Sequence, residues 1–536
     1  MGLRLGFAGG VACHHPDRHH RQLPHCHRKP RQSIKDGVRE RKKWVDNQRN
    51  PPISCENKKI ICIFQKKTLS LQRKFYKQKK VFVMKGITIK NFRCYEEKTI
   101  EFRRGINLLI GDNSVGKTSL LRACNLVMNS FFSGFSDENT IWKSAEPDDF
   151  REIKNIDLQT DDLPIDITFF LDENDCPPIE LSDGTICQLQ AKHSWNDTTE
   201  TEVLKIEKKS KKNARNLITG LKPLKEYASL LQANSHSIVN GDAFQKNALP
   251  LFAYFTTEDI HSVRKFDKEK KEFKKYPQKP SFGYFESHDC KGLLDCWIKR
   301  LLVLKEAKKG DVEIECVRNA IISALGSDGC GIIQDIDIRT NAEEVYFLYL
   351  DGREVRSDLL SDGYRRLVSI VVDLAMRSAL LNKVKFGSEA YKQTHGTVII
   401  DEIDEHLHPA LQVRILKALH DTFPKIQFIV STHAPLVMSS VESNESNVVY
   451  MLSYKDKQYT HVEVNPYGMD ASTIMETTLN QVARNIEIDK ELKMLFDLID
   501  RDDISKARQQ LDSLREKMNN SDPELSRAEA LISFLE

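Results

Sequence analysis

The chain has 536 residues, more than one typical domain, and a hydrophobic content of 40% that is enough for sizeable cores. No apolar run approaches the ~20 residues that cross a bilayer, which excludes helical membrane spans. The 12 cysteines are scattered without CxxC pairs, a usage that predicts reduced thiols and a cytoplasmic location.

The first 83 residues differ in charge from the rest of the chain. They hold 21 Lys and Arg against 5 Asp and Glu, a net charge of +16, whereas residues 84–536 carry −13. Basic, Pro-containing sequence without hydrophobic periodicity is typical of a disordered arm. Metal binding at 13–15 and 25–27, whose His and Cys spacing fits no standard zinc pattern, stays open, as does nucleic-acid binding. We expect the natural chain to begin at Met84, and a chain shortened to 84–536 to keep its activity.

From Met84 onward the pattern predicts a folded α/β chain. Alternation indicates strands at 85–90 and 98–102, joined by the turn Asn91-Phe92-Arg93, and an apolar strand at 106–110. The charge run at 264–279 favours a solvated loop, and the acids at 500–503 favour a turn between two helices within 492–514. Further strands are expected at 165–171, 185–207, 249–256, 331–339 and 344–350, and further helices at 217–233, 293–307, 312–325 and 523–535.

A phosphate-binding loop follows the strand at 106–110. The sequence 111–118 fits G-x-x-x-x-G-K-[ST], and an apolar helix is predicted after it. The glycines allow a tight turn whose N–H groups, with the helix N-terminus, attract phosphate oxygens. Lys117 would reach the β- and γ-phosphates, and Thr118 would hold Mg²⁺. The residues assigned to phosphate binding are Gly111, Asp112, Asn113, Ser114, Val115, Gly116, Lys117, Thr118 and Ser119.

Two acids end a second apolar strand, at 397–400. A strand that is apolar on both faces is typical of the middle of a parallel sheet. Asp401 is placed where a carboxylate can hold the Mg²⁺ shell through water. Glu402, one residue later, can orient or deprotonate an attacking water, which is most of what phosphoryl transfer requires from a protein side chain.

Two further stretches narrow the class of site. The sequence at 360–366, Leu-Ser-Asp-Gly-Tyr-Arg-Arg, opens an apolar helix predicted over 367–381. A Ser and a Gly at a helix N-terminus can bind phosphate without lysine. The strand that begins at 427 ends at His433, which can hydrogen-bond a γ-phosphate and report its presence. Alone, Ser361 would be an N-cap and His433 a surface histidine, but their order along the chain favours a phosphate site.

Residues 84–455 resemble ATPase heads of the ABC type, in the RecF, SMC and Rad50 class. The motifs that carry the resemblance are Asn91-Phe92-Arg93, the loop 111–118, the signature-like 360–366, the strand 397–402 and Ser-Thr-His-Ala-Pro at 431–435. Asp-Glu-His-Leu-His-Pro at 404–409 is similar to the version in stand-alone ATPases of bacterial defence, above all the Septu-type ATPase subunit that also occurs with retrons. At 362–364 the sequence is Asp-Gly-Tyr, where the transporter form of the signature has Gly-Gly-Gln, and this difference favours the RecF-like branch over a transporter.

The resemblance implies ATP and Mg²⁺ as cofactors and two subunits that pair head to tail. ATP would lie between the phosphate loop of one subunit and Ser361 and Gly363 of the other. Glu402 would be the catalytic base and His433 the sensor of the γ-phosphate.

Two further residues are implied less directly. Arg93 would contact the nucleotide. Such heads also carry a metal-contacting glutamine after the phosphate loop, for which Gln159 is the nearest candidate although it lies among polar residues.

The predicted fold class is α/β: a P-loop NTPase of ABC-ATPase type with a mixed central sheet, an inserted α+β and helical region, and a C-terminal helical tail. The expected divisions are an extension at 1–83, the head at 84–455 and a strand with a helical docking tail at 456–536. Within the head we expect a lobe with the phosphate loop at 84–170, the insertion at 171–350, and the signature, acidic strand and His433 at 351–455.

The expected function is ATP hydrolysis by a homodimer or higher homo-oligomer. It would control a nuclease or retron partner, bound through the C-terminal region, in anti-phage defence. Two alternatives stay open: a RecF- or Rad50-like repair ATPase that binds DNA itself, and a nucleotide-gated scaffold with little turnover. Nothing in the sequence calls for a membrane.

Overall fold

A computed structural model of the chain describes residues 82–140, 142–151, 163–171, 176–212, 215–239, 242–257, 273, 278–518 and 521–536. Several predictions concern residues outside these ranges and stay predictions: those for Gln159, for the segments 13–15 and 25–27, and for most of the charge run at 264–279. Within the described part of the chain, no helix is long and apolar enough to span a bilayer.

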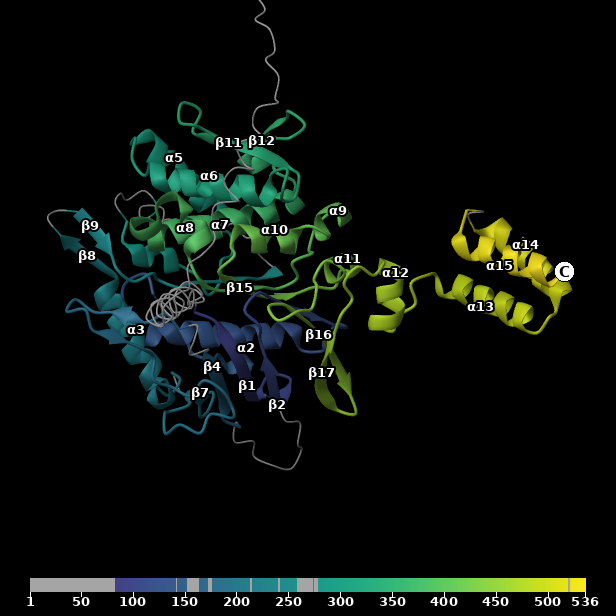
Figure 1. Cartoon of the computed structure of the whole chain (residues 1–536), viewed down its shortest axis with the longest axis horizontal. Helices are drawn as coiled ribbons and strands as arrows, with labels where there is room; N and C mark the ends of the chain where they lie inside the picture. Colours follow the sequence, from purple (N-terminus) through teal and green to yellow (C-terminus); the bar gives the residue numbers. More distant parts are fainter. Residues whose placement is uncertain are drawn as a thin grey trace, which may run out of the picture. The chain divides into compact units, whose positions relative to one another are not determined.

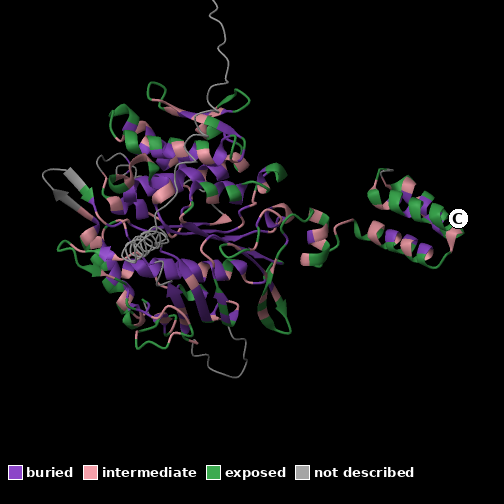
Figure 2. Cartoon of the chain, viewed as in Figure 1, coloured by how far each residue is buried: buried purple, intermediate pink, exposed green. Residues whose placement is uncertain are grey.

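A six-stranded sheet forms the centre of the fold (Figure 1). Its order is β10-β14-β15-β3-β16-β17, and all neighbours are parallel except β16 and β17. Strands β10, β14, β15 and β3 are buried along their whole length (Figure 2), as expected for runs apolar on both faces. The strands are β3 Ile106–Ile110, β10 Leu251–Phe255, β14 Gly396–Ile400, β15 Ile426–Ser431, β16 Val448–Lys455 and β17 Gln458–Val464.

Helix α2 packs between this sheet and a second, antiparallel sheet (Figure 1). The second sheet has the order β2-β1-β4-β7. Helix α2 contacts β1 and β4 on one side and β14 and β15 on the other, which explains why its apolar residues do not keep to one face. The bounds are β1 Met84–Phe92, β2 Tyr95–Glu101, β4 Ile165–Leu171, β7 Leu204–Lys208 and α2 Lys117–Ser130.

Helix α7 packs against β10 and is the centre of a helical layer (Figure 1). It contacts α5, α6 and α8, and α6 in turn contacts α10 and the three-stranded sheet β11-β12-β13. The bounds are α5 Leu294–Glu306, α6 Asp311–Leu325, β11 Ile333–Arg339, β12 Glu344–Tyr349, β13 Glu354–Arg356, α7 Asp362–Phe386, α8 Ala390–Gln393, α9 Pro409–Gln412, α10 Ile415–Thr422 and α11 Pro435–Met438.

The remaining elements are short hairpins, one longer helix and the C-terminal helices. Residues 176–245 contain β5 Ile179–Glu180, β6 Ile186–Cys187, α3 Lys222–Ser235, β8 His236–Val239 and β9 Asp242–Gln245. The C-terminal residues form α12 Ala471–Thr473, α13 Ile486–Asp500, α14 Ile504–Lys517 and α15 Pro523–Leu535. Helices α13 to α15 pack on a small core of their own that includes Leu495, Leu514 and Leu525, and residues 501–503 form the expected turn.

Three boundaries differ from the sequence analysis. Phe82, two residues before Met84, is 2% exposed and packs edge-on against Phe131 and Phe252, with ring centroids 5.8 and 5.4 Å apart. Strand β10, expected within the insertion, pairs with β14 in the central sheet, and β17, expected in the tail, completes that sheet. Parallel strands such as β10 and β14 pair with segments distant in the chain, so local periodicity does not reveal that β10 belongs to the central sheet, whereas β17 pairs antiparallel with β16, the preceding strand.

Candidate active site

The carboxyl ends of four parallel strands meet at one edge of the central sheet. The N–H of Asp401, directly after β14, donates to the carbonyl of Phe255 at the end of β10 at 2.9 Å. The N–H of Thr432, directly after β15, donates to the carbonyl of Leu109 in β3 at 3.2 Å. The phosphate loop, the acidic pair and His433 therefore lie at the same edge, where ligands of open α/β sheets bind.

The phosphate loop leaves β3 in a backbone conformation that few side chains permit. Gly111, Ser114 and Gly116 have φ angles of 134°, 67° and 94°, and such alternation lets successive N–H groups converge. A Cβ at Gly116 would lie 2.4 Å from the Tyr95 hydroxyl oxygen, so the end of the loop requires glycine.

Lys117 is the first residue of α2 and is only 6% exposed. Its Nζ donates to the carbonyl oxygens of Gly111 and Asp112 at 2.8 and 2.9 Å, so its charge is held across the hollow of the loop. Burial lowers the pKa of Lys117 to about 8, against the opposing pull of nearby carboxylates. Phosphate oxygens at this position would favour the charged form.

The acidic pair is held by one hydroxyl and a strained backbone. Glu402 has a φ of 48°, a left-handed conformation that is uncommon outside glycine. Its N–H donates to Ser431 Oγ at 2.8 Å, and the same hydroxyl donates to Asp401 Oδ1 at 2.5 Å. Strain of this kind persists where the surrounding contacts enforce it, which is common in functional sites.

The electrostatics of the pair suit proton transfer. Burial raises the pKa of Glu402, and the charges of Asp401 and two neighbouring acids raise it further. His433 Nε2 lies 4.0 Å from Glu402 Oε1, and burial followed by the charge of Lys117 lowers the pKa of His433. Asp404 Oδ1 accepts from the His433 N–H at 3.3 Å and fixes this segment beside the acids. A carboxylate with a raised pKa is a better base near neutral pH.

A cavity of about 330 Å³ opens beside the acids and α2, lined in part by Thr118, Asp401, Thr256 and Thr257. The buried Thr256 Oγ1 has no hydrogen-bond partner in the described part of the chain. Hydroxyl and carboxylate oxygens are ligands that Mg²⁺ accepts, and it commonly uses one or two carboxylates with substrate phosphates. The donor set, one carboxylate and nearby hydroxyls, therefore fits Mg²⁺.

Thr256 and Thr257 were missed in the sequence analysis. The signal was present, because β10 is an apolar strand that ends in polar residues, as β14 and β15 are. Without the sheet order, nothing placed its end beside Asp401.

The predicted signature, 360–366, contains the N-terminal turn of α7, in which Ser361 and Asp362 are exposed. Ser361 is the N-cap residue, and its side chain makes no capping hydrogen bond. A Cβ at Gly363 would lie 2.5 Å from the carbonyl oxygen of His406, so glycine allows this turn to pack on the loop after the acidic pair. The exposed Ser361 hydroxyl lies at a helix N-terminus, where unpaired N–H groups favour a phosphate.

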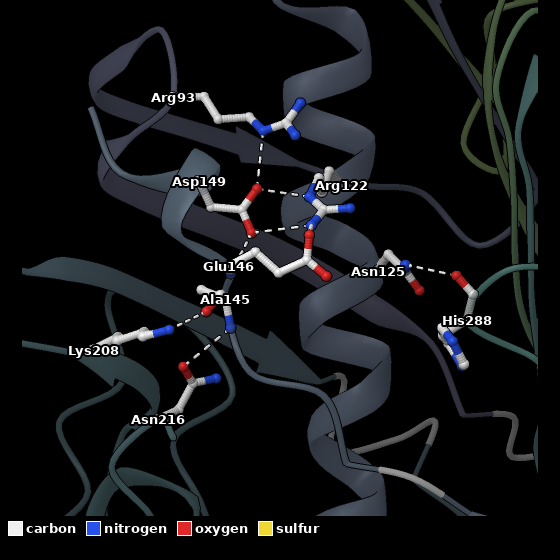
Figure 3. A network of polar contacts seen from close by, with 9 residues as sticks. All are labelled: Arg93, Arg122, Asn125, Ala145, Glu146, Asp149, Lys208, Asn216 and His288. Carbon is white, nitrogen blue, oxygen red and sulfur yellow. Dashed lines mark hydrogen bonds and ion pairs between the residues drawn. The ribbon is translucent and has the colours of Figure 1, made fainter. Parts of the chain in front are cut away.

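Arg93 is held by a buried carboxylate (Figure 3). Its Nε donates to Asp149 Oδ1 at 3.0 Å, and Arg122 Nε donates to the same oxygen at 2.6 Å. The Asp149 side chain is fully buried, and Glu146 accepts from Arg122 Nη2 at 2.6 Å. Asp149 thus fixes the orientation of the Arg93 side chain. Two residues later in the chain, the Tyr95 hydroxyl donates to the carbonyl of Gly116 in the phosphate loop. The nucleotide contact of Arg93 stays a prediction.

The phosphate loop and the acidic strand at one edge of a mixed central sheet define the fold as a P-loop ATPase head. A family model described as "AAA ATPase domain" matches residues 84–322. A second family model, described as "AAA domain, putative AbiEii toxin, Type IV TA system", matches residues 228–439. The chain thus contains an AAA-type ATPase domain, which implies ATP binding. Shorter stretches are similar to "DNA double-strand break repair Rad50 ATPase" of Pyrococcus abyssi, 37% identical over 67 residues, and to "DNA replication and repair protein RecF" of Tropheryma whipplei, 44% identical over 54 residues.

Named relatives cover parts of the chain. "Retron Vc95 probable ATPase" of Vibrio cholerae serotype O1 biovar El Tor is 38% identical over 154 residues, 28% of this chain and 29% of that protein. "Septu protein PtuA" of Bacillus mycoides is 39% identical over 108 residues, 20% of this chain and 14% of that protein. "Retron Ec83 probable ATPase" of Escherichia coli is 36% identical over 136 residues, 25% and 23% of the two chains. The matches thus span less than a third of each relative.

Proposed function

We propose that the chain hydrolyses ATP with Mg²⁺, pairs head to tail with a second copy when ATP binds, and so controls a partner nuclease in anti-phage defence. Similarity to retron and Septu ATPases supports the biological role. The observation that carries the enzymatic part is the geometry of Glu402: a carboxylate of raised pKa, on a strained and hydrogen-bonded backbone, next to Asp401 at the carboxyl edge of the sheet.

Each residue in the proposed mechanism has one task. The loop 111–118 binds the phosphates, and Lys117 balances their charge. Thr118 and Asp401 would hold Mg²⁺, which neutralises charge that develops on the phosphoryl oxygens. Glu402 accepts a proton from the attacking water, and neutral His433 hydrogen-bonds the γ-phosphate.

The dimer completes the site from the other side. Ser361 is exposed at the N-cap of α7 and Gly363 lies in the same turn, where helix N–H groups favour a phosphate. In a head-to-tail pair, this turn of one subunit would cover the ATP held by the other. Hydrolysis would then release the pair and change the surface offered to the partner protein.

Equilibrium binding of labelled ATP to Lys117→Ala tests the nucleotide part of the proposal. The substitution removes a lysine that contacts two loop carbonyls, so binding should be lost. Lys98 is also buried and donates to a backbone carbonyl, that of Tyr459, so Lys98→Ala is the matched control and should bind ATP within about twofold of wild type. Unchanged affinity in Lys117→Ala would disprove the assignment of the loop. DNA-stimulated turnover of the isolated protein would instead favour a repair ATPase, and stable ATP dimers without phosphate release would favour a scaffold.

A further inference from the structure

A buried arginine on α7 is the last residue of the signature-like stretch 360–366 and lies one turn beyond Ser361 and Gly363. Arg366 is 1% exposed and is five residues from Ser361. Its Nη1 donates to the carbonyl oxygen of Thr256 at 2.7 Å, and its Nη2 donates to that of Asp401 at 2.9 Å. One guanidinium group therefore joins the carboxyl ends of β10 and β14 to the signature helix. A fully buried arginine is costly unless such contacts compensate it.

The carbonyl of Asp401 belongs to the peptide that precedes Glu402. The N–H of that same peptide donates to Ser431 Oγ at 2.8 Å, so both polar groups of the peptide plane are held by side chains. Rotation of this plane changes the φ of Glu402, which stands at 48°. The direction of the Glu402 carboxylate thus depends on two hydrogen bonds, of which Arg366 makes one and Ser431 the other.

The first turn of α7 is also in contact with the loop after the acids. The Cα of Gly363 approaches the carbonyl of His406 so closely that a Cβ would lie 2.5 Å from its oxygen. A shift of the N-terminus of α7 would therefore act on residues 401–406 through this packing and through the guanidinium of Arg366.

We propose that Arg366 is a positioning residue for Glu402, and that it transmits the placement of the signature end of α7 to the base of the same subunit. This rests on the proposed function, in which Ser361 and Gly363 cover the ATP of the partner subunit. Closure over one nucleotide would then align the base that acts on the other, which couples the two sites of the pair.

Arg366→Lys tests the inference, with Arg377→Lys as the matched control. The lysine keeps the charge but cannot donate to both carbonyls in the same geometry. Arg377 lies on the same helix, is fully buried and donates to the carbonyls of Gly283 and Phe285 at 2.9 and 2.8 Å, outside the site residues. Both substitutions should lower stability in urea, but only Arg366→Lys should affect the chemistry.

For Arg366→Lys we expect kcat to fall roughly 10- to 100-fold, the loss typical of a displaced catalytic group. The Kd for ATP should change less than about twofold and ATP-dependent dimers should still form, because the residues that bind phosphate are unchanged. Arg366→Gln, which offers one amide donor, should show the same separation of kcat from Kd.

The inference is overturned if either Arg366 variant keeps the wild-type kcat, if ATP affinity falls in parallel with kcat, or if Arg377→Lys loses as much activity. Should neither Arg366 variant fold, Ser431→Ala provides the measurement, because it releases the other side of the same peptide. It must then reduce kcat without loss of ATP binding. Glu402→Gln, assayed beside them, separates the two claims: if that variant hydrolyses ATP normally, the proposed function fails whatever Arg366 does.

Discussion

The buried Lys117 makes ATP binding sensitive to pH. Burial lowers its pKa to about 8 in the free protein, so its charge is lost as the pH rises through 8. Bound phosphates favour the charged form and raise the pKa again, which means that ATP binding takes up a proton in this window. At pH 9 only about one molecule in eleven carries the charge before binding. The affinity for ATP should therefore fall about tenfold between pH 7 and pH 9, or about 1.4 kcal/mol.

Titration calorimetry at pH 7, 8 and 9, in buffers with different ionisation enthalpies, measures both the affinity and the proton uptake. Lys117→Arg is the control, because a guanidinium stays protonated over this range. Whatever the affinity of this variant for ATP at pH 7, the ratio of its affinities at pH 7 and pH 9 should be close to one. Equal wild-type affinity at pH 7 and pH 9, or the same fall in the arginine variant, would refute the role given to the Lys117 charge.

Two further predictions concern stability. Phe82→Ala should lower the free energy of unfolding in urea by about 3 to 5 kcal/mol, because it empties an aromatic core position. The control Phe534→Ala, at an 86% exposed site, should cost less than about 0.5 kcal/mol. A chain shortened to 84–536 should be destabilised as Phe82→Ala is, and an unaltered urea midpoint in either protein would contradict the packing of Phe82. Burial lowers the pKa of His395 to about 3, while Nδ1 accepts from the Phe82 N–H at 3.1 Å. The imidazole of His395 thus stays neutral in the folded state, whereas in the unfolded chain it binds a proton below pH 6.5, so about 2 kcal/mol of the free energy of unfolding should be lost between pH 7 and pH 5. His395→Asn should reduce this dependence of stability on pH. The same dependence in the variant and the wild type would argue against the role of His395.

Much of the site could be predicted from the sequence because its residues follow recognisable strands. The phosphate loop, Asp401 and His433 each come after an apolar run, and parallel strands bring such ends to one edge. The coarse fold and the turn at 501–503 followed from periodicity in the same way.

The rest depends on contacts between distant segments. Thr256 became a site residue only when β10 was found next to β14, and Arg366 only when its partners proved to be backbone carbonyls. Neither the order of strands in a sheet nor a hydrogen bond to a backbone carbonyl produces a motif that can be recognised in the sequence. The two arginine partners of Asp149, Arg93 and Arg122, likewise come from other elements, so no local motif marks this carboxylate.

The proposed shared site is most directly tested with Glu402→Gln, which removes the base and preserves shape. ATP should still bind, hydrolysis should fall roughly 10²-fold or more, and the dimer formed with ATP and Mg²⁺ should persist longer than that of wild type. In a double variant that also carries Ser361→Arg, the arginine should fill the phosphate seat on α7, so the protein should bind ATP but remain a monomer on sizing. If Glu402→Gln hydrolyses ATP at the wild-type rate, the acidic pair is assigned wrongly. If the double variant still forms the ATP-dependent dimer, residues 360–366 do not cover the nucleotide and the head-to-tail mechanism is wrong.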